Sequence, residues 1–189
     1  MNQETRSNIY AFLSRTFADI LDYDAIRDLK RTPDLLDLIG KETRTLFDEE
    51  NIENLQDLLN IDFTSLFVIS THPVEQAVVD NSTDIPIGLE NPVMQFYFNH
   101  GFEVNLNQTH IMAPDHLAVE LGFMHKLVEE DNGPAQKAFL AQHLLSWVPP
   151  YLLGCATMAT TPFYRDICDF AAEFLISDYD GLMQEADHG

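Results

Sequence analysis

The segment 113–127 contains, close together, the features of a helix start, an acid, a histidine and a long stripe of apolar residues. Pro114 suits the first turn of an α-helix, where its missing N–H costs nothing. Asp115 beside it favours the positive end of the helix dipole. The apolar residues that follow recur at helical spacing, at Leu117, Leu121, Met124 and Leu127. The pattern predicts an amphipathic helix that begins at Pro114 and turns this stripe toward a core.

Helical periodicity continues along most of the chain, and the alternation typical of strands is nearly absent. Helices are predicted over about residues 3–22, 24–31, 34–39, 52–68, 91–100, 114–130, 135–146, 151–158 and 161–176. The sequence Val148-Pro149-Pro150 predicts a turn between two of them. These features predict an all-α fold, a single-domain helical bundle that spans residues 1–177.

Two segments depart from the helical pattern. Between about residues 70 and 90, His72-Pro73 and Ile85-Pro86-Ile87-Gly88 interrupt any helical period, which predicts an irregular loop. A loop of this length inside a compact domain is often functional. The last residues, 178–189, are rich in acids and predict a flexible tail.

The charge of the chain limits its partners. Its 189 residues include 31 acids and 10 bases, for a formal net charge of −21. This charge argues against binding nucleic acid or inserting into an anionic membrane, and it suits a positively charged peptide. An acidic adaptor or a mimic of nucleic acid is an alternative that rests on charge alone. The polar N-terminus and the lack of a long apolar run predict a cytoplasmic protein.

His116 and Glu120 stand four residues apart, so that one helix face would present two metal ligands. A helical metal-dependent enzyme that uses this pair is therefore the main alternative to a binding protein. Zinc sites take three or four protein ligands, and neither His110 nor His125 has a compelling spacing to complete one. The chain also lacks the two Glu-x-x-His pairs that di-iron bundles require, since this spacing occurs once, at Glu185 and His188, and it lacks nucleophile motifs and phosphate-binding loops. No metal or cofactor of its own is expected.

Five blocks of sequence resemble the TorD/DmsD/NarJ family of redox-enzyme maturation chaperones, and they occur in the family's order. They are Asp-Phe-Thr-Ser-Leu-Phe-Val at 62–68, His-Pro-Val-Glu-Gln-Ala-Val-Val-Asp at 72–80, the Asp-His helix at 114–124, His-Leu-Leu-Ser-Trp at 143–147, and Thr-Pro-Phe-Tyr-Arg at 161–165. The resemblance covers about residues 6–176. Val74 and Val78 stand where the family often carries aromatic residues.

The resemblance implies an all-helical, non-enzymatic cytoplasmic chaperone for a molybdenum-cofactor oxidoreductase. Such a chaperone binds the catalytic subunit or its twin-arginine leader until the cofactor is inserted. Asp115 and His116 match the family's functional pair, and Asp115 suits an arginine through charge-assisted hydrogen bonds. The remaining residues expected to bind the client are Leu66, Phe67, Pro73, Glu75, Asp80 and Glu120. The oligomeric state, a homodimer included, stays open.

Overall fold

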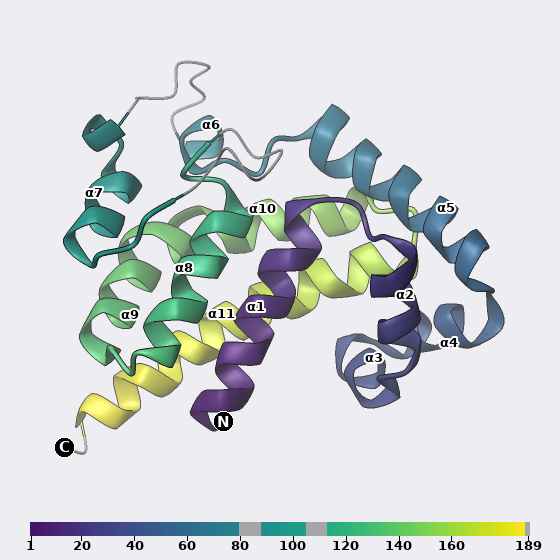
Figure 1. Ribbon diagram of the computed structural model, residues 1–189, viewed down its shortest axis with the longest axis horizontal. Helices are drawn as coiled ribbons and strands as arrows, with labels where there is room; N and C mark the ends of the chain where they lie inside the picture. Colours follow the sequence, from purple (N-terminus) through teal and green to yellow (C-terminus); the bar gives the residue numbers. More distant parts are fainter. Residues whose placement is uncertain (80–87, 105–112, 188–189) are drawn as a thin grey trace. The chain divides into compact units, whose positions relative to one another are not determined.

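The computed structural model of the protein describes residues 1–79, 88–104 and 113–187. Among these residues the regular structure is helical, with an isolated antiparallel bridge between Val74 and His116. The elements are α1 (Gln3–Ala18), α2 (Tyr23–Lys30), α3 (Pro33–Ile39), α4 (Lys41–Glu49), α5 (Ile52–Phe63), the π-helix η1 (Thr64–Ser70), α6 (Glu75–Val79), the 3₁₀-helix η2 (Gly88–Glu90), α7 (Pro92–Asn99), α8 (Leu117–Glu129), α9 (Gly133–Phe139), the π-helix η4 (Leu140–Leu144), α10 (Leu145–Met158) and α11 (Pro162–Asp187) (Figure 1). The predicted all-α fold class is confirmed.

The described residues cluster into two compact units, and each is made of separate stretches of the chain. Unit 1 comprises residues 1–18, 73–149 and 175–189, and unit 2 comprises residues 19–72 and 150–174. Helices α10 and α11 therefore contribute residues to both units.

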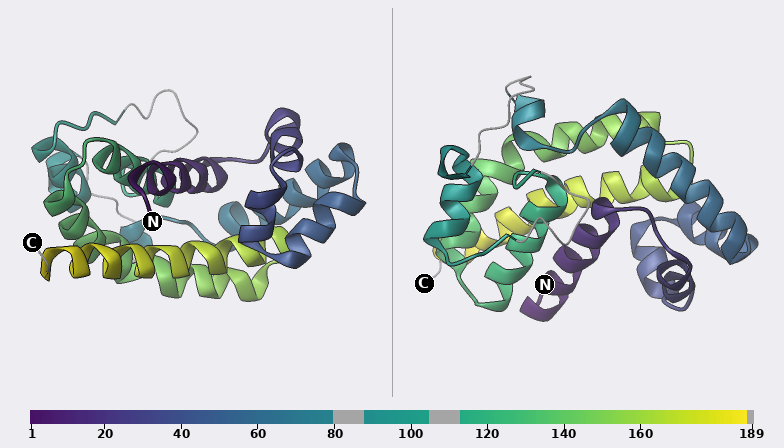
Figure 2. Two further views of the ribbon diagram at one scale, coloured as in Figure 1. Left: turned by 90° about the horizontal axis from the view of Figure 1, so that it is seen from below. Right: turned by 45° about the horizontal axis from the view of Figure 1, so that its top comes forward.

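In unit 1, α1 packs along α8 (Figure 1, Figure 2). The hydroxyl of Ser14 donates a 2.7 Å hydrogen bond to the carbonyl oxygen of Ala118, which joins the two helices. The predicted apolar stripe of α8 is buried, at Leu117, Leu121, Met124 and Leu127. On another side of α8, Phe123 contacts Tyr97 and Phe139, with ring centroids 4.7 and 4.8 Å apart. The helical period therefore identified the buried face of α8 correctly.

The predicted flexible tail is wrong, because α11 continues to Asp187. Asp178, the first residue of that tail, is buried in unit 1. Its carboxylate accepts bonds of 2.5 and 2.9 Å from the guanidinium of Arg6 and one of 2.8 Å from the hydroxyl of Tyr10. Leu182 is buried one turn further on. Asp178, an acid whose position suggested a solvated end of the chain, is thus the ion-pair partner of the half-buried Arg6.

In unit 2, α4 is a helix that the sequence analysis missed. Its first turn is held by Asp166 of α11, whose Oδ2 accepts hydrogen bonds from the backbone N–H and the hydroxyl of Thr43 at 3.2 and 2.9 Å. Gly40 allows this approach, since a Cβ there would lie 2.2 Å from the same oxygen. The capping carboxylate of Asp166 is 123 residues away in the sequence, so no local sequence feature predicts this helix.

Another prediction concerns a helical boundary. The turn predicted at Val148-Pro149-Pro150 is wrong, because all three residues lie within α10. None of the described helices is long and apolar enough to cross a membrane.

Candidate functional site

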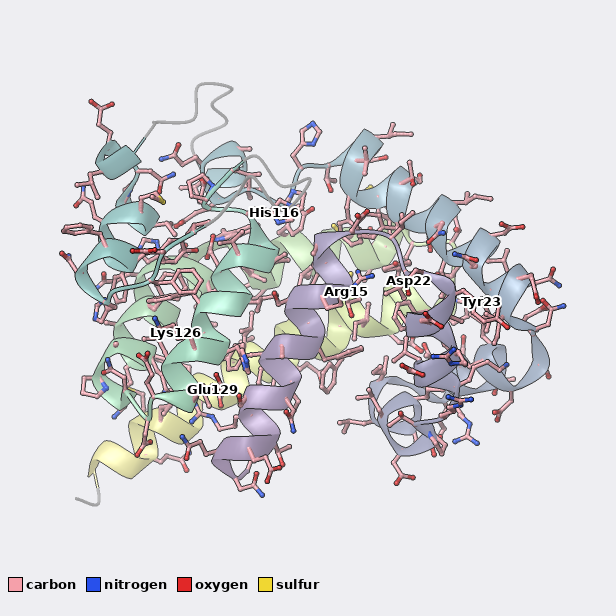
Figure 3. The ribbon with its side chains drawn as sticks, viewed as in Figure 1. Arg15, Asp22, Tyr23, His116, Lys126 and Glu129 are labelled. Atoms are coloured by element: carbon pink, nitrogen blue, oxygen red, sulfur yellow. The ribbon has the colours of Figure 1, made fainter. Side chains whose placement is uncertain are left out.

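The start of α8 is built around His116. This residue is the N-cap, with an extended backbone, and its Nδ1 accepts a 3.1 Å hydrogen bond from the N–H of Ala118. The helix therefore begins at Leu117, and the predicted start at Pro114 is wrong by three residues. The imidazole supplies the capping acceptor, and it lies at the N-terminal end of α8 in Figure 3.

Asp115, just before the cap, holds the segment that leads into α6. Its carbonyl oxygen accepts a 2.9 Å bond from the N–H of Glu75, and its Oδ2 accepts a 3.2 Å bond from the N–H of Gln76. The N–H of Leu117 in turn donates a 2.8 Å bond to the carbonyl oxygen of Pro73. These bonds bring four of the predicted site residues together in unit 1, namely Pro73, Glu75, Asp115 and His116.

Three carboxyl groups lie near the bonds between residues 73–76 and 115–117, and they differ in their hydrogen-bond and ion-pair partners. Glu75 pairs with His143 of η4, whose Nδ1 lies 3.0 Å from Oε2. Asp115 and Glu120 have no exposed surface. The Oδ1 of Asp115 has no hydrogen-bond partner among the described residues, and Glu120 has no cationic partner there, with the neutral indole N–H of Trp147 directed toward it. Unsatisfied buried carboxyl oxygens are costly, so this cluster stands out from an ordinary core.

The electrostatics of the cluster are dominated by burial and by negative charge. Burial, and next the charges of Glu75 and Asp115, raise the pKa of Glu120 well above its ordinary value, while the indole N–H of Trp147 opposes this rise. Burial and the same carboxylates also raise the pKa of the Tyr97 hydroxyl, which donates a 3.1 Å bond to the carbonyl oxygen of Pro114. The arrangement favours the uptake of a positively charged group.

His116 is neutral over most of the pH range, because burial lowers its pKa to about 4. Since Nδ1 accepts the capping bond, the proton of the neutral ring lies on Nε2. His116 therefore offers a hydrogen-bond donor without a charge, while Asp115 and Glu120 offer acceptors.

The sequence analysis missed three residues of this cluster. His143 and Trp147 lie in a block that it noticed but gave no role, and Tyr97 carried no local signal. All three contact the cluster from helices that are distant in sequence: Tyr97 from α7, His143 from η4 and Trp147 from α10.

Two other predicted binding residues, Leu66 and Phe67, belong to unit 2. Both are buried, and the ring of Phe67 packs 5.3 Å from Phe63 and 5.8 Å from Tyr164. They serve the core of that unit in this structure, while their neighbours Val68 and Ile69 are exposed. Asp80 lies outside the described residues.

Comparison with known proteins places this site within a matched region. The model of the nitrate reductase delta subunit family matches residues 30–152, which include Glu75, Asp115, Glu120 and His143. The chain belongs to this family. The resemblance seen in the five sequence blocks is thereby confirmed.

Relatives with curated names support the same assignment. The chain is 26% identical to the chaperone protein TorD of Aliivibrio salmonicida over 96% of both chains. It is 28% identical to TorD of Vibrio cholerae over 96% of this chain and 95% of the relative. It is also 33% identical to TorD of Actinobacillus pleuropneumoniae over 41% of this chain and 40% of that protein. No solved structure matches. These relatives are chaperones by name, not enzymes, which agrees with the predicted non-enzymatic role.

Proposed function

We propose that this protein is a cytoplasmic maturation chaperone for a molybdenum-cofactor oxidoreductase. It binds the catalytic subunit, through its twin-arginine leader or its apoenzyme form, until the cofactor is inserted. The single observation that carries the proposal is the match to TorD chaperones over nearly the full length of both chains. The cluster at the start of α8 supplies the chemistry, and we name it the α8 acidic site, formed by Glu75, Asp115, His116 and Glu120.

The α8 acidic site suits an arginine better than a lysine. A guanidinium presents five N–H donors in a planar fork, whereas an ammonium group is a compact point charge. Asp115 and Glu120 together have three buried carboxyl oxygens that no cation among the described residues pairs with. Several acceptors at different directions match a fork of donors, and such charge-assisted bonds are about twice as strong as neutral ones.

Two exposed apolar side chains follow the acidic site closely along the chain. Helix α6 has no buried residue, and its last two side chains, Val78 and Val79, are exposed. Because α6 begins at the residues bonded to Asp115, these valines are close in the chain to the carboxylates. A leader joins its arginines to an apolar stretch, so a peptide of this kind has a place for both of its parts.

The metal-dependent alternative gains no support from the geometry. His116 caps α8 through Nδ1, so this nitrogen is occupied by a hydrogen bond and is not open to a metal ion. Within the described part of the chain, no group of three or more histidine, cysteine, aspartate or glutamate residues is arranged to hold a metal ion.

The proposal is tested by titrating a fluorescent leader peptide from a molybdoenzyme encoded by the same organism. Two copies serve as comparisons, one with both arginines changed to alanine and one with both changed to lysine. We expect saturable binding of the leader, loss of binding for the alanine copy, and weaker binding for the lysine copy. Absence of binding to the leader and to the apoenzyme alike would refute the proposed function.

The part played by the site is tested with Asp115→Asn, whose amide oxygen keeps an acceptor for the N–H of Gln76. Asp131→Asn is the matched control, because Asp131 is an exposed acid just beyond the other end of α8, about 20 Å away along 13 helical residues. Asparagine also tolerates the positive φ of 53° at that position. We expect at least about a tenfold loss of affinity for Asp115→Asn and no change for Asp131→Asn.

A further inference from the structure

Glu120 is the least satisfied carboxyl group of the α8 acidic site. It projects from the first turn of α8 and has no exposed surface, and among the described residues the donor directed toward it is the neutral indole N–H of Trp147. A buried carboxylate with one neutral donor and no counter-charge is far less stable than a protonated carboxyl in the same place. The free protein therefore favours the protonated form of Glu120.

The groups around Glu120 strengthen this preference. Glu75 of α6 and Asp115 of the preceding turn place two further carboxylates near it. The indole N–H of Trp147 on α10 is directed toward it. Burial, and next the charges of Glu120, Asp115 and Glu75, raise the pKa of the Tyr97 hydroxyl on α7. Two imidazoles belong to the same cluster. His143 pairs with Glu75, and His116 accepts the hydrogen bond from the N–H of Ala118.

A guanidinium group would reverse the preference. Placed between Asp115 and Glu120, it would donate to their carboxyl oxygens and would neutralise the charge that burial disfavours. An ionised Glu120 is then stabilised by a direct ion pair in a poorly solvated place. The same arginine that satisfies the carboxyl group would therefore also drive its ionisation.

We propose that Glu120 receives an arginine of the client together with Asp115, and that it releases its proton to solvent as the arginine binds. The carboxylic acid and the guanidinium cation become a carboxylate–guanidinium pair, and one proton leaves for each client bound. This inference rests on the proposed function, and it adds a proton-linked acceptor beneath the Asp-His pair.

Access to the two carboxyl groups requires α6 to move. The segment that begins α6 is bonded to Asp115 at the carbonyl oxygen and at Oδ2, and Asp115 and Glu120 have no exposed surface while these bonds are made. A helix of five residues with none buried is easily displaced, because few apolar contacts are lost. The binding of an arginine side chain thus exchanges the amide N–H of Gln76 for the donors of the guanidinium.

The test is calorimetric titration of the twin-arginine leader at pH 6 to 8, in two buffers whose ionisation enthalpies differ. The difference in observed heat between the buffers gives the number of protons released per peptide. We expect close to one proton in the lower part of this range, with affinity that increases up to tenfold per pH unit. Glu120→Gln has no proton to release, so its value should fall to near zero while Glu129→Gln, at an exposed position of the same helix, keeps that of the wild type.

The outcomes separate this inference from the proposed function. Tight binding with no proton release, or with a release that Glu120→Gln leaves unchanged, would overturn the inference and leave the chaperone role standing. Failure of the wild-type protein to bind leader or apoenzyme would overturn both. The number of protons released by the wild-type protein tests the inference even if Glu120→Gln does not fold.

Discussion

Two buried acids, Asp62 in unit 2 and Glu120 in unit 1, have almost the same exposure and opposite surroundings. Asp62 is 1% exposed and accepts hydrogen bonds from the N–H groups of Thr160 and Thr161 and from the hydroxyl of Thr161, at distances of 2.6 to 3.2 Å. Glu120 is 0% exposed, and among the described residues the donor directed toward it is the single indole N–H of Trp147. Burial alone therefore does not tell what an acid does.

The difference separates a structural carboxylate from one suited to a ligand. Asp62 ties the end of α5 to the start of α11, and its charge is balanced by donors that the fold itself provides. Glu120 lowers the stability of the fold at the pH where it would ionise, since the fold gives its charge no compensation. A group that weakens the protein in this way is a candidate for function rather than for folding.

The largest effect on stability should come from removing the carboxylate of Asp62, the buried acid that has hydrogen-bond donors. Asp62→Ala leaves the buried backbone N–H and hydroxyl of Thr161 and the part-buried N–H of Thr160 without an acceptor, so we expect it to reduce the free energy of unfolding by about 3–5 kcal/mol. Denaturant unfolding measures the loss. Asp57→Ala, at an exposed position of the same helix, is the control and should change little. A loss below about 1 kcal/mol for Asp62→Ala would contradict this role.

His116 should give the next largest effect, through pH. Burial lowers its pKa to about 4 from 6.5, so between these values the unfolded chain binds a proton that the folded chain does not. Stability should therefore fall as the pH decreases from 6.5 toward 4, by up to about 3 kcal/mol from this group.

The variant His116→Asn keeps an N-cap acceptor and removes the titration. Its unfolding free energy should fall less than that of the wild type over this pH range, whereas His72→Asn, at an exposed position, should follow the wild type. If both variants lose stability in parallel with the wild type, His116 is not the group that titrates.

A smaller effect of opposite sign is expected from Glu120→Gln. The raised pKa of Glu120 means that the unfolded chain ionises before the folded one, so its contribution is present at low pH and is lost as the pH rises. Removing the carboxyl group should raise the free energy of unfolding by about 1–3 kcal/mol at pH 8, and by much less at pH 4. A variant that is less stable than the wild type at pH 8 would show that Glu120 is satisfied in solution.

The comparison also shows what could be predicted from the sequence. The buried stripe of α8 and the Asp-His pair follow from local spacing, and the structure joins that pair to Pro73 and Glu75, as a binding site there requires. What decides the state of each acid is not local. The donors to Asp62 lie 98 and 99 residues away, and Asp178 was assigned to a flexible tail because its partner Arg6 is 172 residues distant.

The same reason explains the errors at the site. His116 and Glu120 are four residues apart, which suggested one helical face, but the pairing of residues 73–76 with 115–117 makes His116 the cap instead. The α8 acidic site is also contacted from three other helical elements, by Tyr97, His143 and Trp147. The spacing of residues along the chain does not predict these contacts. Spacing predicts faces of helices, whereas the packing of distant helices determines which buried charges are compensated.

The carboxyl carbon resonance of Glu120, followed by NMR at neutral pH before and after saturation with the twin-arginine leader, tests the central claim most directly. Glu120→Gln identifies the resonance by its loss. The account predicts the shift of a protonated carboxyl group in the free protein and that of an ionised carboxylate in the complex. The same protonation state in both forms, with the leader bound, would contradict it.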